Sequence, residues 1–147
     1  MDKWTVQDRH GNIILYRTEM TAYDGTPVRF VYDQEADIME IFFGENEPAT
    51  GVELTDHIIL RLNRQTRRAI SLMLLHFSIM TERTEYGPRS YPLNKLNEVP
   101  KDLRELVVRL ITSLPVSQFL KLSYFQTSPT KQMPFTFVES QPMMSMA

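Results

Sequence analysis

Cysteine is absent from the chain, and glycine, tryptophan and long apolar runs are scarce. Without cysteine there is no disulfide framework, no thiolate metal site and no cysteine nucleophile, so the hydrophobic core alone must stabilise the fold. The N-terminal segment is interrupted by charged residues such as Asp2, Lys3 and Asp8 and lacks the apolar run of a signal peptide. No run approaches the roughly 18 apolar residues of a membrane-spanning helix. We therefore expect a cytoplasmic protein without a membrane segment.

Neither sign of charge dominates the chain. The formal net charge is −2, which gives no overall field that would attract nucleic acid or an anionic membrane. The five glycines form neither a phosphate-binding loop nor a Gly-x-Ser-x-Gly motif, which disfavours nucleotide hydrolysis and acyl transfer. Hydrophobic residues at 42% and charged residues at 23% are typical of a folded domain, and 147 residues suffice for one hydrophobic core.

Short segments with the period of a β-strand follow one another along the first half of the chain. Apolar and polar side chains alternate over residues 28–33, 38–43, 52–54 and 58–62. A further hairpin is predicted over residues 3–17, because Gly11 and Asn12 accept the positive φ of a tight turn. Residues 69–77 are apolar on both faces, as in a central strand. We predict an antiparallel β-meander sheet of five to six strands in sequence order.

The second half of the chain predicts helices that cover this sheet. After Pro100, large aliphatic residues recur at three- and four-residue steps up to Leu114, and Pro115 ends the pattern. Residues 116–122 would form a short second helix. The predicted fold class is α+β, with the sheet covered on one face by one or two C-terminal helices. Residues 1–125 would form the domain, with a surface connection at 81–98, and residues 126–147 a flexible tail poor in apolar bulk.

One stretch resembles a known family. The residues Tyr32-Asp33-Gln34-Glu35-Ala36-Asp37, followed by Ile38-Met39-Glu40-Ile41, resemble the opening motif of domain-of-unknown-function family 2283, a small bacterial β-meander domain. The resemblance covers about residues 28–78, although such proteins usually carry a turn glycine at the place of Arg68 and an acidic residue at that of Ser71. Its members are often encoded beside small toxin genes, which implies an antitoxin-like or partner-binding role.

A second and shorter resemblance lies at the N-terminus. Residues 4–12, Trp-Thr-Val-Gln-Asp-Arg-His-Gly-Asn, look like the first hairpin of small nuclease-fold toxins from the same gene neighbourhoods. The rest of such a nuclease, a helix after Tyr16 with paired histidines, is missing from the sequence. We therefore infer no nuclease activity from it.

Acidic residues are concentrated between Asp33 and Asp56, where no lysine or arginine occurs. Asp33, Glu35 and Asp37 imitate the alternating ligands of a calcium loop, but Ile38 and Gly44 occupy the positions of its glycine and its bidentate glutamate. We expect these carboxylates to cap local backbone amides instead, and we predict no metal site and no cofactor. Nothing in the sequence places two carboxylates across a cleft, so an enzyme with a carboxylate site is the weakest reading.

The basic residues and the histidines give weak signals. Arginine side chains cluster about one turn and are candidate anion-binding residues, with a solvated hairpin tip as the alternative: Arg61, Arg64, Arg67 and Arg68. The turn lacks interleaved aromatic residues, which argues against nucleic acid. The three histidines, His10, His57 and His76, match no metal-binding spacing, so surface or satisfied core positions are expected for them.

The function suggested by these patterns is a non-catalytic protein-interaction module, antitoxin-like and not an enzyme. Aromatic side chains in the 81–98 connection and in the tail offer the contact area typical of interface hot spots, and they are the candidate partner-binding residues: Tyr86, Tyr91, Phe135 and Phe137. The partner would be an unidentified protein, such as a co-encoded toxin, or a second copy of the chain in a homo-oligomer. A nucleic-acid or anion binder using the arginine turn is the alternative.

Overall fold

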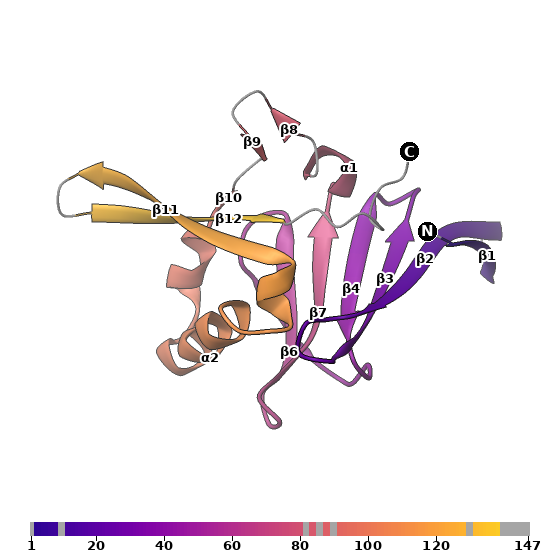
Figure 1. Cartoon of the computed structure of the whole chain (residues 1–147), viewed down its shortest axis with the longest axis horizontal. Helices are drawn as coiled ribbons and strands as arrows, with labels where there is room; N and C mark the ends of the chain where they lie inside the picture. The colour runs from indigo at the N-terminus through magenta and orange to yellow at the C-terminus, as the bar shows by residue number, and fades with distance from the viewer. Residues whose placement is uncertain are drawn as a thin grey trace.

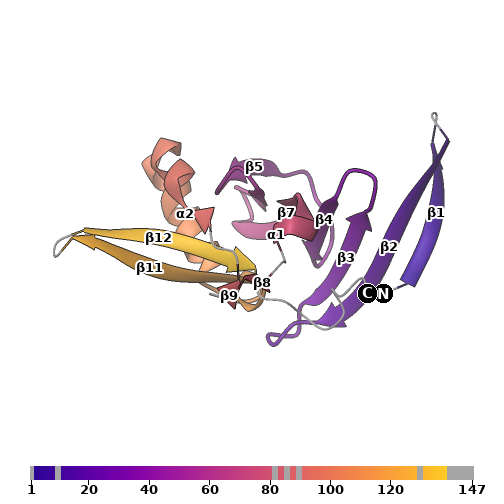
Figure 2. The same ribbon diagram turned by 90° about the horizontal axis from the view of Figure 1, so that it is seen from above.

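The computed structural model of the chain describes residues 2–8, 11–80, 83–84, 87–88, 91–128 and 131–138. Its largest element is a seven-stranded antiparallel sheet, formed by β1 (Asp2–Asp8), β2 (Gly11–Thr21), β3 (Pro27–Asp33), β4 (Ile38–Phe43), β5 (Thr50–Glu53), β6 (Ile58–Asn63) and β7 (Arg68–Leu75). The strands twist about one another, with β1 and β2 curving away at one side (Figures 1 and 2). Together with the helices described below, this sheet confirms the α+β class.

The order of the strands corrects the prediction that they follow the sequence. The order is β1-β2-β3-β4-β7-β6-β5, so the chain leaves β4, crosses to the far edge and returns through β6 and β7. Burial explains this order, because five residues of β7 are buried, including Ile70, Ser71 and Leu72, whereas β5 buries only Val52. The most apolar strand takes the central place and the short, exposed one lies at the edge.

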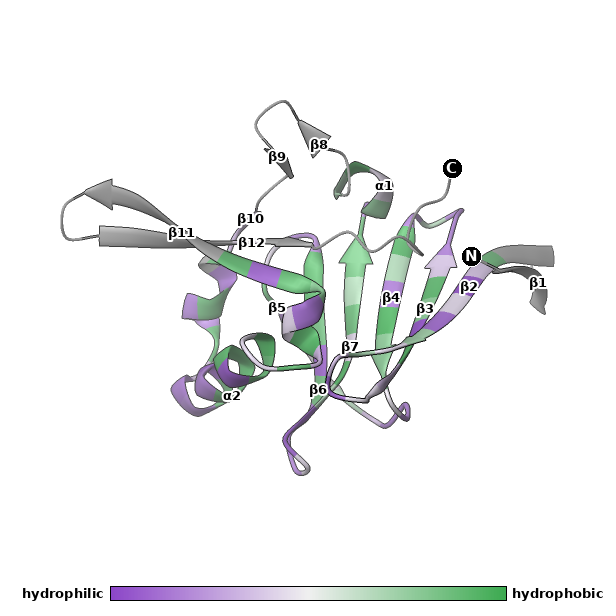
Figure 3. Ribbon diagram, viewed as in Figure 1, coloured by the Kyte–Doolittle hydropathy of each residue, from purple (hydrophilic) through white to green (hydrophobic). Residues whose placement is uncertain are grey.

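The predicted alternation of side chains is confirmed in the strands of the sheet. In β3, Val28, Phe30 and Tyr32 are buried while the residues between them are only partly covered, and β4 and β6 alternate in the same way. Figure 3 shows the hydrophobic colour concentrated on the central strands β4 and β7, with hydrophilic residues at the turn that joins β6 to β7. One face of the sheet therefore supplies the core.

The helices pack on this face, as predicted. The longest, α2 (Lys101–Ile111), begins after Pro100 and buries Leu106, Val107 and Ile111. The shorter ones, α1 (Phe77–Met80), η1 (Asn94–Glu98) and η2 (Val116–Gln118), also contribute buried side chains to the same core cluster. Leu114, predicted on the stripe of the helix, lies beyond its end and is 45% exposed.

The segment after Pro115 corrects the prediction of a second helix over residues 116–122. The helical turn η2 ends at Gln118, and β11 (Leu120–Ser128) begins two residues later. The reason is a partner strand, because β12 (Lys131–Val138) pairs with β11 and satisfies its backbone from Leu120 to Ser128. The boundary predicted between residues 125 and 126 falls inside β11, and the division into domain and flexible tail stays a prediction.

The segment between β7 and α2 contains further short strands. The structure has β8 (Arg83–Thr84) paired with β9 (Gly87–Pro88), and β10 (Tyr91–Pro92) paired with β12. A second sheet of order β10-β12-β11 results, and its β11–β12 part runs out from the body as a two-stranded ribbon (Figures 1 and 2). The predicted connection and the predicted tail are thus parts of one sheet.

Candidate functional site

The face of the large sheet opposite the core carries a polar cluster at its centre. Cross-strand pairing places Glu40 of β4 and Arg61 of β6 on either side of β7. The Arg61 guanidinium donates to Glu40 Oε2 at 2.9 Å and to Ser71 Oγ at 3.1 Å, and the Ser71 hydroxyl donates to Glu40 Oε2 at 2.6 Å. Each of the three polar groups has a partner, so this cluster holds the face together rather than presenting a free nucleophile.

Arg68 is used to fasten the loop after β4. Its guanidinium donates to the carbonyl oxygens of Phe43 and Glu45, and to the Glu47 carboxylate, each at 2.6 Å. The hydrogen bond from Arg68 is the main reason why the pKa of the Glu47 carboxyl lies below its ordinary value. Gly44 has a positive φ, and a Cβ atom added to it would lie only 3.1 Å from Arg68 Nη1, so the loop closes tightly on the guanidinium.

The four candidate anion-binding arginines therefore do not share one environment. Arg61 and Arg68 are engaged in ion pairs within the fold, whereas Arg64 and Arg67 are exposed at the turn between β6 and β7. Within the described residues, neither Arg64 nor Arg67 forms an ion pair. Binding of an anion at this turn stays a prediction, and only two of the four guanidinium groups would be available for it without breaking internal contacts.

The candidate partner-binding residues are brought together in part. Tyr91 of β10 pairs with Thr136 of β12, and Pro92 pairs with Phe135, so the predicted connection meets the predicted tail. Phe135 and Phe137 flank Thr136 along β12, and Thr136 itself is fully buried. Tyr86 lies outside the described residues. The assignment of these residues to a partner surface stays a prediction.

The acidic turn between β3 and β4 caps backbone amides, as predicted from the sequence. Asp33 accepts a hydrogen bond from the Ala36 amide at 3.1 Å. Asp37 has a φ of 56° and accepts from the Tyr32 hydroxyl at 2.6 Å, from the Ser78 amide at 3.0 Å and from the Ser78 hydroxyl at 2.7 Å. Among the described residues, no group of three or more His, Cys, Asp or Glu side chains is placed to hold a metal ion.

Asp37 makes the stability of the fold depend on pH. Desolvation raises the pKa of its carboxyl, but the hydrogen bonds from Tyr32 and Ser78 and the nearby His76 outweigh this effect and hold the pKa below its ordinary value of 3.8. A lowered pKa stabilises the folded state above pH 3.8, and this contribution is lost as the pH falls through the lowered value.

We expect Asp37→Asn, which keeps a residue that tolerates the left-handed φ of 56°, to lower the free energy of unfolding at pH 7 by about 1–2 kcal/mol, because charge-assisted hydrogen bonds are lost. The difference between the variant and the unmodified chain should shrink as the pH falls below about 4. Urea unfolding at a series of pH values measures both effects. If the difference in unfolding free energy stayed constant down to about pH 2.5, the role assigned to the charge would be contradicted.

Two histidines that the sequence did not connect lie side by side at one end of the sheet. His57 precedes β6 and His76 follows β7, and their Nδ1 atoms are 3.2 Å apart. Tyr91 packs on the ring of His57, with ring centroids 5.0 Å apart. The register of the β6–β7 hairpin brings this end of the two strands together. Ile58 pairs with Leu74, and the Leu75 amide donates to the His57 carbonyl oxygen one residue before His76.

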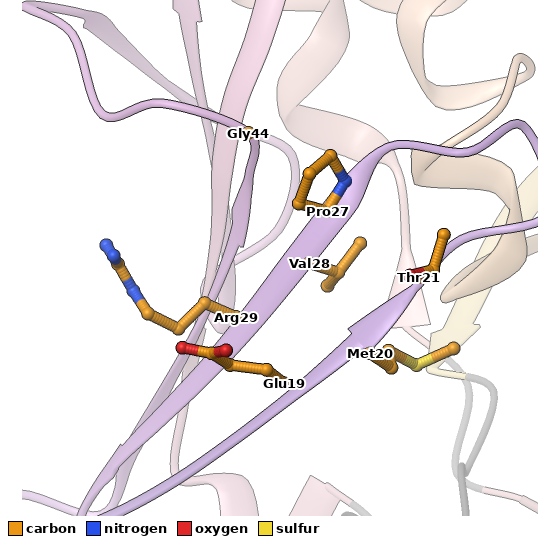
Figure 4. Close-up of a pocket in the computed structure, with 7 residues that line it drawn as sticks. All are labelled: Glu19, Met20, Thr21, Pro27, Val28, Arg29 and Gly44. Atoms are coloured by element: carbon orange, nitrogen blue, oxygen red, sulfur yellow. The ribbon is translucent and has the colours of Figure 1, made fainter.

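Two depressions on the described surface lie beside residues considered above. The one at the end of β2 and β3 measures about 420 Å³, and Figure 4 shows Glu19 and Arg29 on one side of the strands with Met20 and Val28 on the other. A depression of about 270 Å³ lies between the β6–β7 turn and the end of α2, lined by residues that include Arg67, Arg68 and Leu114. Neither of these two depressions contains a set of mutually activating catalytic groups.

The comparisons with known proteins agree with the sequence analysis in one segment. Residues 29–78 match the family model described as "Protein of unknown function (DUF2283)", which confirms the resemblance over about a third of the chain. This segment comprises most of β3, the whole of β4 to β7, and the first residues of α1. No curated protein and no solved structure matches the chain. Among the described residues, none of the helices combines the length and the hydrophobicity needed to cross a bilayer.

Proposed function

We propose that the chain is a non-catalytic, antitoxin-like protein-interaction module whose partner surface is the small sheet β10-β12-β11. The observation that carries the proposal is the pairing of Tyr91–Pro92 with Phe135–Thr136. This pairing joins two segments that are distant in the sequence and that each carry candidate partner-binding aromatic residues. The partner is a protein, either encoded beside the chain in a bacterial genome or a second copy. The lack of cysteine favours a cytoplasmic setting for this encounter.

The shape of this small sheet supports the proposal. In the part of the chain that the structure describes, two residues of β12 pair with β10, and the rest of the β11–β12 ribbon consists of two strands that pair with each other. An isolated two-stranded hairpin is at best marginally stable in water. A ribbon that projects from the body, as in Figures 1 and 2, therefore gains stability when a partner packs on it.

The rival function, binding of an anion or nucleic acid at the arginine turn, receives less support. Arg61 and Arg68 would have to leave Glu40 and Glu47 to reach a phosphate, which would leave half-buried carboxylates without a cation. The remaining pair, Arg64 and Arg67, offers exposed charge that salt screens. Such charge changes the rate of encounter more than the strength of a complex.

The proposal is tested by the recovery of partner proteins from host cells with the tagged full-length chain. Recovery should fall at least about tenfold in a Tyr91→Ala/Phe135→Ala/Phe137→Ala variant, a loss of 1.4 kcal/mol or more. The matched control is Arg64→Ser/Arg67→Asn, in which Asn accepts the left-handed φ of 58° that Arg67 adopts. This control should leave recovery unchanged.

Two further measurements are needed to interpret the change in partner recovery. Circular dichroism checks that both variants are folded, and sedimentation equilibrium shows whether the recovered partner is a second copy. Loss of the partner in the arginine variant alone would transfer the function to the arginine turn. Nucleic acid that co-purifies and is removed on raising the salt from about 0.15 to 1 M would do the same, because phosphate contacts release counterions.

A further inference from the structure

The pair His57 and His76 has the geometry of two ligands to one metal ion. Two imidazole nitrogens bound to Zn²⁺ at about 2.0–2.1 Å lie about 3.3 Å apart at the tetrahedral angle. The observed distance between the two Nδ1 atoms is 3.2 Å, with the rings inclined at 78° and their centroids 5.2 Å apart. The separation needed for chelation thus exists without movement of either backbone.

We propose that His57 and His76 form a two-histidine site for a divalent transition-metal ion of the imidazole-binding class, Zn²⁺ or Cu²⁺. Imidazole suits these ions, whereas Mg²⁺ and Ca²⁺ prefer oxygen ligands. The protein supplies two ligands, so the remaining coordination positions are open to water or to a donor from another molecule. The site adjoins the partner surface proposed above, because Tyr91 of that surface packs on the His57 ring, but the two ligands themselves lie outside it.

The backbone around the pair fixes both imidazoles. The His57 amide donates to Thr55 Oγ1 at 3.0 Å and its carbonyl oxygen accepts from the Leu75 amide at 2.8 Å, which ties it to the β6–β7 hairpin. His76 has a φ of 56° and its carbonyl oxygen accepts from the Met80 amide at 3.0 Å. Tyr91 packs against the His57 ring and restricts its rotation.

Two carboxylates lie near the pair. Asp37 interacts electrostatically with His76, and Asp56 with His57. Both carboxylates are already occupied, Asp37 by Tyr32 and Ser78 and Asp56 by Lys95 at 2.9 Å. Direct ligation is therefore left to the histidines, and Lys95 offsets the charge of Asp56.

In the metal-free protein the pair is joined by one Nδ1–H···Nδ1 hydrogen bond, in which the two rings have different tautomers. Binding requires both Nδ1 lone pairs. The proton on one Nδ1 therefore moves to the Nε2 of the same ring by exchange with water, and both imidazoles stay neutral. His76 is exposed and His57 is half-buried, so solvent has access for this exchange.

Isothermal titration of the full chain with ZnCl₂, in a buffer that does not bind metal, tests the site. We expect one Zn²⁺ per chain, with the affinity reduced at least about tenfold by His57→Ala and by His76→Ala. Because a chelate needs both ligands, the double variant should bind Zn²⁺ about as weakly as either single variant does. His10→Ala is the matched control and should bind as the unmodified chain does, and MgCl₂ should not bind at the pair.

A measurement on the unmodified chain covers the case in which a variant is poorly folded. In long-range ¹H–¹⁵N spectra of the histidine rings, Zn²⁺ should shift the Nδ1 signals of His57 and His76 together and leave His10 in place. The proposal is overturned if these two signals do not respond to Zn²⁺, or if the double variant binds Zn²⁺ as tightly as the unmodified chain.

Discussion

Replacing Phe119 by alanine should lower the free energy of unfolding by about 3–5 kcal/mol, the usual cost of a cavity left by a buried phenylalanine. Phe119 is fully buried and follows η2. Its ring meets Phe30 of β3 edge-on at 5.6 Å and Phe43 of β4 at 6.0 Å between centroids. It is thus a direct contact between the segment that covers the sheet and the sheet itself.

Urea unfolding followed by circular dichroism measures this loss as a shift in midpoint at constant slope. Phe119→Leu should recover most of the stability, with a cost of about 1 kcal/mol, because it restores most of the volume. Val108→Ala on the exposed side of α2 is the surface control, since Val108 is 43% exposed, and it should stay within about 0.5 kcal/mol. If Phe119→Ala behaved like this control, the packing of the C-terminal segment on the sheet would be wrong.

The strands of the large sheet could be predicted because their signal is local. Alternation over residues 28–33 and 38–43 depends only on neighbouring side chains, and the structure buries the predicted faces. The order of the strands is not local, because the pairing of β4 with β7 joins segments about thirty residues apart in the chain. The only hint was that residues 69–77 are apolar on both faces, which is typical of a central strand.

The C-terminal strands were missed for a related physical reason. Val116, Phe119 and Leu120 fit a helical spacing, whereas Leu120 and Leu122 fit the period of a strand, so this short apolar run does not distinguish the two. The decision comes from the partner strand, which pairs Leu120 with Val138 and Leu122 with Thr136. A polar segment such as residues 131–138 has little intrinsic tendency to form a strand. Backbone hydrogen bonds to β11 and β10 stabilise the strand that its composition alone does not favour.

The side-chain clusters needed tertiary contacts that a single sequence does not display. Glu40, Ser71 and Arg61 meet because three adjacent strands bring them close together on one face, and this arrangement depends on the unpredicted order β4-β7-β6. The approach of His57 to His76 required less, since a hairpin with its turn near residues 64–67 brings its two ends together. The register of that hairpin continues to His57 opposite Leu75, the residue before His76, so it brings the two histidines near each other but does not fix the approach of their rings.

Arg68 holds the loop after β4 through three hydrogen bonds, so its replacement should cause the second large loss of stability. Arg68→Met should lower the free energy of unfolding by about 2 kcal/mol, because it removes the donors to the carbonyl oxygens of Phe43 and Glu45 while keeping a similar apolar stem. Arg68→Lys should recover less than half of the loss, since one ammonium group cannot reproduce the planar fork of a guanidinium. Arg64→Met at the same turn is the matched control and should stay within about 0.5 kcal/mol, because Arg64 is exposed.

The pH dependence distinguishes this role of Arg68 from a general effect of charge. The pKa of the Glu47 carboxyl is lowered mainly by the hydrogen bond from Arg68, so the carboxylate stabilises the fold above its ordinary pKa of 4.5 and this contribution disappears as the pH falls. The difference in unfolding free energy between the unmodified chain and Arg68→Met should therefore become smaller in acid. It should not disappear, because the carbonyl oxygens of Phe43 and Glu45 do not titrate. Equal losses for Arg64→Met and Arg68→Met would show that the turn acts only through its charge, and the loop after β4 would then need another explanation for its closure.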